Sequence, residues 1–456
     1  MAARRMGRWT VALAVAVGTA GVASAVDLPP PVEQLVGGSD EVGLVGADWV
    51  GPVVPDGGVA GDLVSVFQTG ELSTSLRWAV ESAVAEAGAA MVTTRGFSIG
   101  LVRLTRGSEV LQQARSAGWG FPMGVSAFPD AAIAAVMGRE LASVVGGDSI
   151  VMSETSAGIR GALPGDVIEL RGAAGNRVRF EIGRVVPDDE IGGTEILMDT
   201  DQSARLGAIY DTRALILQIP DRAALDSALA KYLPRSGVRS RIRRSWDLPD
   251  PDLTLGLGET KALLGEFDLD YSNLSSGGWT AMSPEWVARY MPPERELYPT
   301  GIEARCHAVI EADLRAALRE VVSQGLESGI DLDNTNTYGG CGRGMARYAR
   351  SSAFLGSVSR HSWAQAIDMN TVTNCQGCVP VLDCRIVRIF RKHGFAWGGN
   401  FLRPDGMHFE WVGEQRNRLP YPSTYCPNRV ALPTEGLVES QPSMSTMFAD
   451  DGWLGE

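Results

Sequence analysis

Histidine is scarce in this chain: its 456 residues include four, and none precedes His307. A catalytic triad with a histidine base therefore cannot form from the residues before that position alone. This argues against a serine hydrolase built on Gly96-Phe97-Ser98-Ile99-Gly100, although that segment matches the G-x-S-x-G nucleophile elbow. The elbow also needs a helix after the serine, whereas residues 101–104 are typical of a continuing strand.

An excess of positive charge is also lacking. The formal net charge is −13 at pH 7, whereas a nucleic-acid partner requires a clustered basic face. We therefore expect no nucleic acid as a main partner. No G-x-x-x-x-G-K-[ST] segment and no convincing G-x-G-x-x-G segment occurs. A chain of this length, with 45% hydrophobic residues, is expected to form two or more domains.

Cysteine is absent from the first two thirds of the chain. An even number of cysteines confined to one region of an exported chain predicts disulfide bonds. Six cysteines allow 15 pairings, which stay open at this point. A structural zinc at the single C-x-x-C would need two more ligands at similar spacing, so a disulfide is the better interpretation. The six are Cys306, Cys341, Cys375, Cys378, Cys384 and Cys426.

Long apolar runs are missing as well, and the N-terminal one is short. Three arginines, the last at Arg8, precede an apolar run at residues 11–22, which is too short for a confident membrane span. Residues 23–25, Ala-Ser-Ala, form a small-x-small cleavage site. We predict a signal peptide (residues 1–25), a secreted or cell-envelope location and no stable membrane span after cleavage. An uncleaved anchor is the alternative.

The first half of the mature chain contains helical and strand patterns. Residues 26–61 are rich in Pro, Gly and Val and predict an extended leader. Residues 62–233 predict an α+β domain of unknown function. Its expected elements are a helix after Ser73 that carries Leu76, Val80 and Val84, two strands at 167–170 and 178–182 joined by a turn, and a helix at 224–233.

The second half is expected to contain a linker, a second domain and a tail. Residues 234–295 are expected to be a linker region, and the arginines at its start form either a solvated segment or a basic stripe for anionic wall polymers. Residues 296–426 predict a second domain with a long amphipathic helix at 302–326 and a short helix at 386–393 that ends at Gly394. Residues 427–456 predict a polar, loose tail.

Two short segments of this second domain carry ligands suited to zinc. Residues 359–368 contain His361 and Asp368, and residues 405–410 contain Asp405, His408 and Glu410. Two imidazoles and one carboxylate leave a fourth position open, as in catalytic zinc sites. Both segments include strand-like stretches, so an antiparallel pairing would bring His408 beside Asp368 and turn Glu410 to the same face.

A hydrolytic zinc site also needs a general base and a cation that stabilises the oxyanion. Zinc lowers the pKa of a bound water from 15.7 to about 7, and a nearby carboxylate can then take the proton. Asp405 lies at the turn just before His408 and can face the metal without ligating it. A cation near the zinc would stabilise an oxyanion, and arginine suits this role because it stays charged.

The two segments resemble the signature of the LAS-type zinc peptidases, S-x-H-x-x-G-x-A-x-D followed by D/E-x-x-H. This group of peptidase family M15 includes VanY-like D-alanyl-D-alanine carboxypeptidases and L-alanyl-D-glutamate endopeptidases. The resemblance covers about residues 300–426, and residues 397–399 look like the family's W-G-G segment. Two positions depart from the pattern: Ala364 replaces a glycine, and Asn400 stands where relatives often carry Asp. The matching positions are Ser359, His361, Ala366, Asp368, Asp405 and His408.

The resemblance implies a role for four of these residues. His361, Asp368 and His408 would bind Zn²⁺, and Asp405 would be the general base. The family places an arginine upstream of the first motif, which makes Arg347 the first candidate and Arg343 the reserve. The implied fold is α+β: a C-terminal zinc peptidase domain with a small antiparallel sheet flanked by helices, preceded by a separate α+β domain.

The implied function is that of an exported zinc metallopeptidase that acts on peptidoglycan stem peptides. Carboxypeptidase and endopeptidase action remain open, because both use the same metal chemistry. A catalytically inactive wall-binding module on the same fold is the alternative. The other two histidines, His307 and His393, are interpreted as structural.

Overall fold

The computed structural model of the chain describes residues 45–46, 61–273, 278–293, 295–297, 301–331, 341–349, 357–431 and 447–448. The predicted signal peptide lies outside these residues, as does the predicted leader apart from residues 45–46 and 61. The described residues belong to one compact unit that begins at Gly43. Among them, none of the helices combines the length and the hydrophobicity that a membrane span requires.

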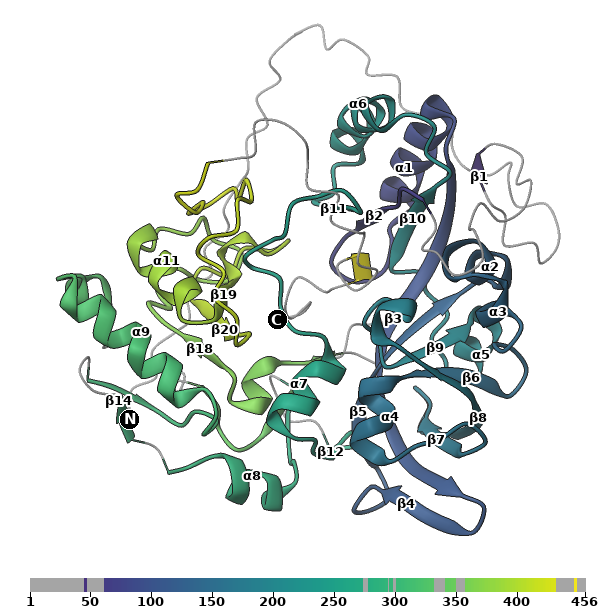
Figure 1. Ribbon diagram of the computed structural model, residues 1–456, viewed down its shortest axis with the longest axis horizontal. Helices are drawn as coiled ribbons and strands as arrows, with labels where there is room; N and C mark the ends of the chain where they lie inside the picture. Colours follow the sequence, from purple (N-terminus) through teal and green to yellow (C-terminus); the bar gives the residue numbers. More distant parts are fainter. Residues whose placement is uncertain are drawn as a thin grey trace, which may run out of the picture. The chain divides into compact units, whose positions relative to one another are not determined.

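A 12-stranded sheet forms the first part of the described chain, in the order β11-β2-β10-β3-β7-β8-β6-β9-β5-β12, with β1 and β4 paired to β3 (Figure 1). Strand β3 also pairs with β5, which brings the two together across this order. Most pairs are antiparallel, but β5–β9 and β6–β8 are parallel. The strands are β1 (Val45–Gly46), β2 (Val64–Phe67), β3 (Ala90–Arg106), β4 (Glu109–Gln113), β5 (Trp119–Phe128), β6 (Ser149–Ser153), β7 (Val167–Arg171), β8 (Arg177–Val186), β9 (Ile196–Asp199), β10 (Arg213–Leu217), β11 (Arg241–Arg244) and β12 (Leu269–Asp270).

Helices cover this sheet where the sequence shows apolar positions at helical spacing. In α1, Leu76, Val80 and Val84 are buried, and the Ser73 hydroxyl accepts a hydrogen bond from the Leu76 amide at the N-cap. The predicted helix after Ser73 is therefore confirmed, as is the predicted helix at 224–233. The helices are α1 (Thr74–Ala87), α2 (Asp130–Met137), α3 (Arg139–Ala142), α4 (Glu154–Arg160), α5 (Thr200–Arg205), α6 (Arg222–Tyr232) and α7 (Leu257–Leu264), with 3-10 turns η1 (Asp188–Ile191) and η2 (Leu233–Ser236).

Two further predictions for this part are confirmed. Strands β7 and β8 pair in antiparallel register from Val167 opposite Glu181 to Arg171 opposite Arg177. Ser98 lies within β3, opposite Gly124 of β5, so the chain continues as a strand after the serine. The nucleophile elbow of a serine hydrolase is not formed there.

The described residues of the second part form three small sheets. The sheet β18-β20-β19 lies beside α11, which also contacts α9 (Figure 1). The six cysteines form three disulfides, 306–341, 375–378 and 384–426. The elements are β13 (Trp279–Thr280), α8 (Pro284–Tyr290), β14 (Arg295–Leu297), β15 (Ile302–Ala304), α9 (Glu311–Ser323), η4 (Glu327–Gly329), β16 (Ala346–Ala349), β17 (Ser357–Val358), η6 (Arg360–Trp363), β18 (Ala366–Asp368), α11 (Cys384–Lys392), β19 (Phe395–Trp397), η7 (Gly398–Asn400) and β20 (His408–Trp411).

The prediction of one long helix at 302–326 is wrong. The segment forms β15, then a turn that contains His307, and then the shorter helix α9. His307 Nδ1 accepts a hydrogen bond from the Val309 amide, and its Nε2 lies 3.1 Å from the Leu264 carbonyl oxygen. These contacts fix a turn where a helix was expected, and burial lowers the pKa of His307 to about 4. His307 is thus structural, as predicted.

The prediction of a linker at 234–295 is also wrong for the described residues of that range. Arg243 in β11 is buried, and β11 pairs with β2 along its whole length. Further along, β12 pairs with β5 at the other end of the large sheet. Both interpretations of these arginines, a solvated segment and a basic stripe, assume exposed side chains, but a strand can turn one arginine inward against an aromatic ring, as Arg243 does over Phe67.

The predicted loose tail at 427–456 needs a correction at one point. Met447 is fully buried, and Phe448 packs against Phe128 with ring centroids 5.3 Å apart. Arg213 donates to the carbonyl oxygens of both residues, at 2.9 and 3.4 Å. The polar composition of the tail concealed this apolar pair.

Four buried charges join α7 to the large sheet. Lys261 of α7 is within ion-pair distance of Glu195 and Glu266, and its Nζ also donates to the Pro122 carbonyl oxygen at 2.7 Å. Arg160 at the end of α4 pairs with the same two carboxylates. All four side chains are at most 6% exposed, so each charge depends on its partners for the stabilisation that water would otherwise supply.

We predict that Lys261→Met lowers the free energy of unfolding by about 3 kcal/mol, because it leaves two buried carboxylates with one cation. Urea denaturation measures the loss. The matched control is Lys231→Met, which breaks an exposed pair with Glu86 and should cost much less, because water already screens these charges. Equal losses in the two variants would contradict the importance of burial.

Candidate metal centre

The pairing of β18 with β20 assembles the centre. Asp368 lies directly opposite His408 in the antiparallel register, as predicted. Asp368 Oδ1 is 3.2 Å from His361 Nε2 and 3.2 Å from His408 Nδ1. Each of the three side chains offers one ligand atom, and these atoms lie within 4.8 Å of one another.

His361 is held in place by its surroundings on η6. The Ser359 hydroxyl accepts a hydrogen bond from the His361 amide, so this serine orders the turn that carries His361. His361 Nδ1 lies 3.0 Å from the Cys341 carbonyl oxygen, so a proton on Nδ1 leaves Nε2 free to face Asp368. The Cys306–Cys341 disulfide fixes this carbonyl to the turn that follows β15.

Ala364 ends η6 in a conformation that normally favours glycine. Its φ is 51°, in the left-handed region. The family's glycine at this position is therefore explained by the backbone, and alanine adopts the same turn here. Its methyl group lies against Gly342, since a Cβ at position 342 would come within 2.8 Å of it.

His408 is held by a second carboxylate. Its Nε2 lies 3.4 Å from Glu410 Oε2, which is consistent with the predicted shared face of the two residues on β20. Arg360 Nε donates to Glu410 Oε1 at 3.2 Å. A carboxylate on the far nitrogen of a metal-binding histidine orients the ring and raises its basicity, so Glu410 positions the His408 ring.

The centre is strongly polarised. Burial opposes ionisation of Asp368, but the charges and hydrogen bonds of His361 and His408 outweigh it and hold its pKa well below the usual range. Burial likewise opposes protonation of His408, yet its hydrogen bonds to Asp368 and Glu410 raise its pKa to about 10. In the metal-free protein His408 is therefore a cation at neutral pH.

Asp405 lies beside this cluster. Its amide donates to the Gly398 carbonyl oxygen, and Gln376 Nε2 lies 3.4 Å from its Oδ2. Its Oδ1 is buried and has no hydrogen-bond partner among the described residues. Burial raises its pKa to about 6, against the opposing charge of His408. A buried, partnerless carboxylate oxygen next to the cluster suits a group that receives a proton from water.

The two candidate arginines lie near the first motif, on the side of β16. Arg347 is in β16 opposite Trp279, its amide donates to the Ser362 hydroxyl, and its carbonyl accepts from the Ser359 amide. The guanidinium groups of Arg343 and Arg347 both lie over the Trp279 ring, 4.9 and 5.6 Å from its centroid. Their role in catalysis stays a prediction.

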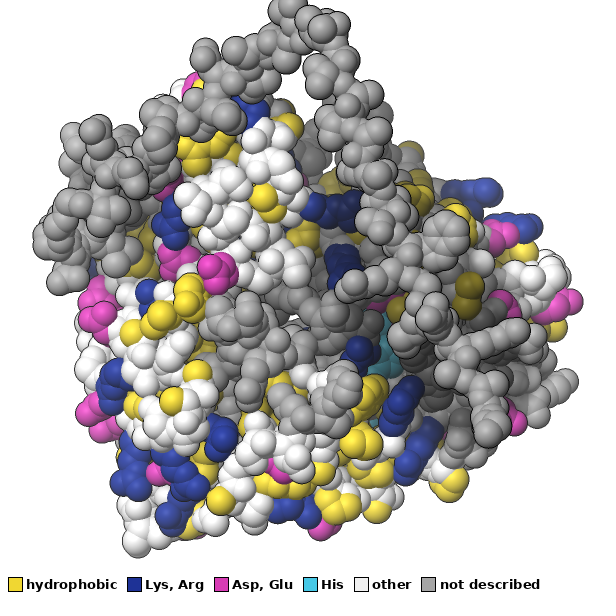
Figure 2. All heavy atoms as spheres, turned by 180° about the vertical axis from the view of Figure 1, so that it is seen from behind, with side chains coloured by type: hydrophobic (Ala, Val, Ile, Leu, Met, Phe, Trp, Pro, Cys, Tyr) yellow, Lys and Arg dark blue, Asp and Glu magenta, His cyan; other side chains and the backbone are white. Residues whose placement is uncertain are grey.

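The donor set fits zinc. Two imidazoles and one carboxylate are common ligands of catalytic zinc, and both histidines have a second partner that fixes the nitrogen facing Asp368. On the face shown in Figure 2, Lys and Arg side chains are scattered among acidic and apolar ones, and histidine surface is visible at one place.

Sequence reasoning missed three contributors. Gln376 lies in the C-x-x-C loop, which was interpreted only as a disulfide, and the Cys341 carbonyl is a backbone group without a side-chain pattern. Arg360 stands between Ser359 and His361, at a position that the S-x-H pattern leaves unspecified. Period-two spacing places Glu410 on the face of His408, and its contact with the ring gives it a role that the spacing alone does not specify.

Comparison with known proteins supports the same region. A family model described as D-alanyl-D-alanine carboxypeptidase, of peptidase family M15, matches residues 355–411. This short match supports that family and a peptidase-type function, and it specifies no particular member. No curated protein shows a significant sequence match to the chain.

One solved structure similar to part of the chain is the extracellular domain of the noncanonical ABC-type transporter YknZ from Gram-positive bacteria. The match covers 40% of this chain and 99% of that chain, with 9% sequence identity and a TM-score of 0.26. A TM-score of that size does not establish a shared fold.

We predict that zinc binding at pH 7.5 releases about one proton, because the His408 pKa of about 10 means that Nδ1 must lose its proton before it can bind metal. Apparent zinc affinity should therefore rise up to about tenfold per pH unit between pH 7 and 8. Calorimetry in buffers of different ionisation enthalpy counts the protons. His393→Gln, at a histidine bonded to Glu320, should leave the count unchanged. Release of no proton would contradict the assignment of His408 Nδ1 as a zinc ligand.

Proposed function

We propose that this chain is an exported zinc-dependent peptidase that hydrolyses peptide bonds in peptidoglycan stem peptides. The observation that carries the proposal is the cluster of His361, Asp368 and His408, whose ligand atoms meet within the region that matches the carboxypeptidase family model. The buried Oδ1 of Asp405, which has no hydrogen-bond partner among the residues that the structure describes, supports catalysis over binding alone.

Each residue has a distinct task in the proposed reaction. His361, Asp368 and His408 hold Zn²⁺, which when bound polarises a carbonyl group and lowers the pKa of water. Asp405 accepts the proton of the attacking water and passes it to the amine nitrogen that leaves the cleaved peptide bond. A raised carboxyl pKa of about 6 suits this exchange near neutral pH.

Two features support export. Three disulfides brace the second part of the chain, and such bonds persist in oxidising compartments. The N-terminal sequence matches the charge, length and cleavage pattern of a signal peptide. Peptidoglycan lies outside the cell membrane, so location and substrate are consistent.

The description of the matched family favours removal of a terminal D-alanine over internal cleavage. A carboxypeptidase shortens a stem pentapeptide by one D-alanine, whereas an L-Ala-D-Glu endopeptidase separates the stem from its first residue. The products differ in mass, so one digest distinguishes the two reactions.

The test is a muropeptide digest by the full-length, zinc-loaded chain, followed by mass spectrometry. We expect loss of one D-alanine from pentapeptide stems. Asp405→Asn keeps the shape of the side chain but cannot accept the proton, so turnover should fall by at least about 100-fold while zinc stays bound.

Ser98→Ala is the matched control for a serine-dependent reaction and should retain full activity, because Ser98 lies within β3. Retention on wall sacculi without any new fragment would favour the inactive wall-binding module. Undiminished turnover by Asp405→Asn would refute the role of this residue.

A further inference from the structure

Residues 250–255, here called the strap, lie between β11 and α7, well before residue 355, where the family match begins. Sequence patterns placed them in a linker. In the structure they contact residues that support the metal centre at two separate points: the side chain of Asp252 binds Arg391, and the carbonyl oxygen of Leu255 binds Arg360.

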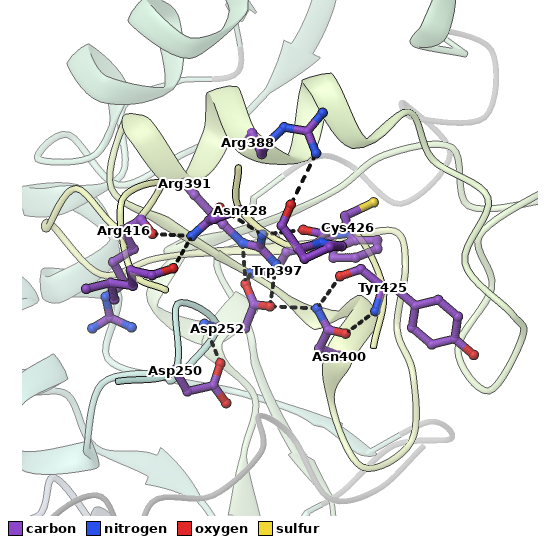
Figure 3. A network of polar contacts seen from close by, with 12 residues as sticks. Asp250, Asp252, Arg388, Arg391, Trp397, Asn400, Arg416, Tyr425, Cys426 and Asn428 are labelled. Carbon is purple, nitrogen blue, oxygen red and sulfur yellow. Dashed lines mark hydrogen bonds and ion pairs between the residues drawn. The ribbon is translucent and has the colours of Figure 1, made fainter. Parts of the chain in front are cut away.

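Asp252 is the first point of contact (Figure 3). Its carboxylate accepts two hydrogen bonds from Arg391, at 2.8 and 2.6 Å, and both side chains are almost completely buried. It also accepts from the Trp397 amide at 3.1 Å and from Asn400 Nδ2 at 2.8 Å. One carboxylate therefore fixes helix α11, the end of β19 and the turn η7 at the same time.

The turn η7 in turn positions Asp405 and His408. The Gly398 carbonyl oxygen accepts the Asp405 amide at 2.9 Å, and the Asp405 carbonyl oxygen accepts the His408 amide at 3.2 Å. A side chain on Gly398 would come within 2.6 Å of the Asp405 carbonyl and 3.1 Å of the His408 Cβ. The fit is so close that a shift of η7 must move both residues.

Asn400 is explained by the same contact. Its Nδ2 donates to Asp252, and its Oδ1 accepts the Tyr425 amide at 2.8 Å. An aspartate at position 400 would place a second carboxylate against Asp252, with no proton between them. Asparagine at position 400 can donate a hydrogen bond to Asp252 of the strap, whereas an aspartate there could not.

The Leu255 carbonyl oxygen is the second point of contact. It accepts a hydrogen bond from Arg360 Nη2 at 2.7 Å. Arg360 Nε donates to Glu410 Oε1, and Glu410 Oε2 faces His408 Nε2. The strap is thus connected to a metal ligand through one arginine and one carboxylate.

We propose that the strap is a positioning element of the metal centre, and that Asp252 and Arg360 are positioning residues for Asp405 and His408. The inference rests on the proposed function, because it takes the cluster to be a zinc site. It implies that the catalytic unit of this chain begins at about residue 250 and extends beyond the region matched by the family model.

The test compares Asp252→Asn and Arg360→Gln with the parent, all as full-length chains. Zinc affinity is measured by chelator competition, and the visible absorption of bound Co²⁺ reports the ligand geometry. We expect each variant to bind zinc about 10–100-fold more weakly, with altered Co²⁺ bands and a fall in kcat at unchanged KM.

Asp166→Asn is the matched control. Asp166 is also buried and accepts two hydrogen bonds from one arginine, Arg106, at 2.9 and 2.8 Å, but it belongs to the large sheet region. It should lower thermal stability without changing zinc affinity or the Co²⁺ bands. An equal loss of affinity in this control would overturn the proposal, because the effect would then reflect general destabilisation.

Folded Asp252→Asn and Arg360→Gln proteins with parental affinity and Co²⁺ bands would also overturn it. If the variants do not fold, hydrogen exchange on the parent decides: zinc should slow exchange of the Trp397 amide and of the strap amides, since coupling is reciprocal. Unchanged exchange overturns the proposal. A parent that binds zinc but cleaves no muropeptide would refute only the proposed function.

Discussion

The candidate site depends on one carboxylate held between two imidazoles. Asp368 lies 3.2 Å from a nitrogen of each histidine, in a largely buried setting. A buried anion in that position is costly unless it is paired, and here His408 supplies the positive charge in the metal-free state. A divalent cation can replace that charge, because each imidazole and the carboxylate offers a lone pair to the same small volume.

Backbone structure brings the three ligands together. The β18–β20 register sets Asp368 against His408, and the 3-10 turn η6 brings His361 back to the same point. Outside the three ligands, Cys341, Glu410 and Arg360 determine which nitrogen of each ring faces inward. The disulfide at Cys341 and the strap then connect these outer groups to distant parts of the chain. A peptidase centre within the matched residues 355–411 thus depends on contacts that lie well outside it.

The sequence was a good guide to local elements and to the ligands. Ser73, the alternating strand at 178–182 and Gly394 predicted their elements correctly, because capping, period-two burial and a left-handed stop are local effects. The two motifs also placed His408 opposite Asp368. The prediction of a long helix at 302–326 was wrong because a disulfide and a buried histidine fix a turn inside an apolar pattern. The prediction of a linker was wrong because Asp252 and Arg243 contact Arg391 and Phe67, which lie far away in the sequence and which no local pattern relates to them.

The most direct test of the central claim is a crystal structure with anomalous diffraction at the zinc edge. We expect one zinc ion bound by His361 Nε2, an Asp368 oxygen and His408 Nδ1, at about 2.0–2.2 Å, with the Asp405 carboxylate nearby but not bound. A zinc ion bound through His408 Nε2, or held by other residues, would contradict this arrangement.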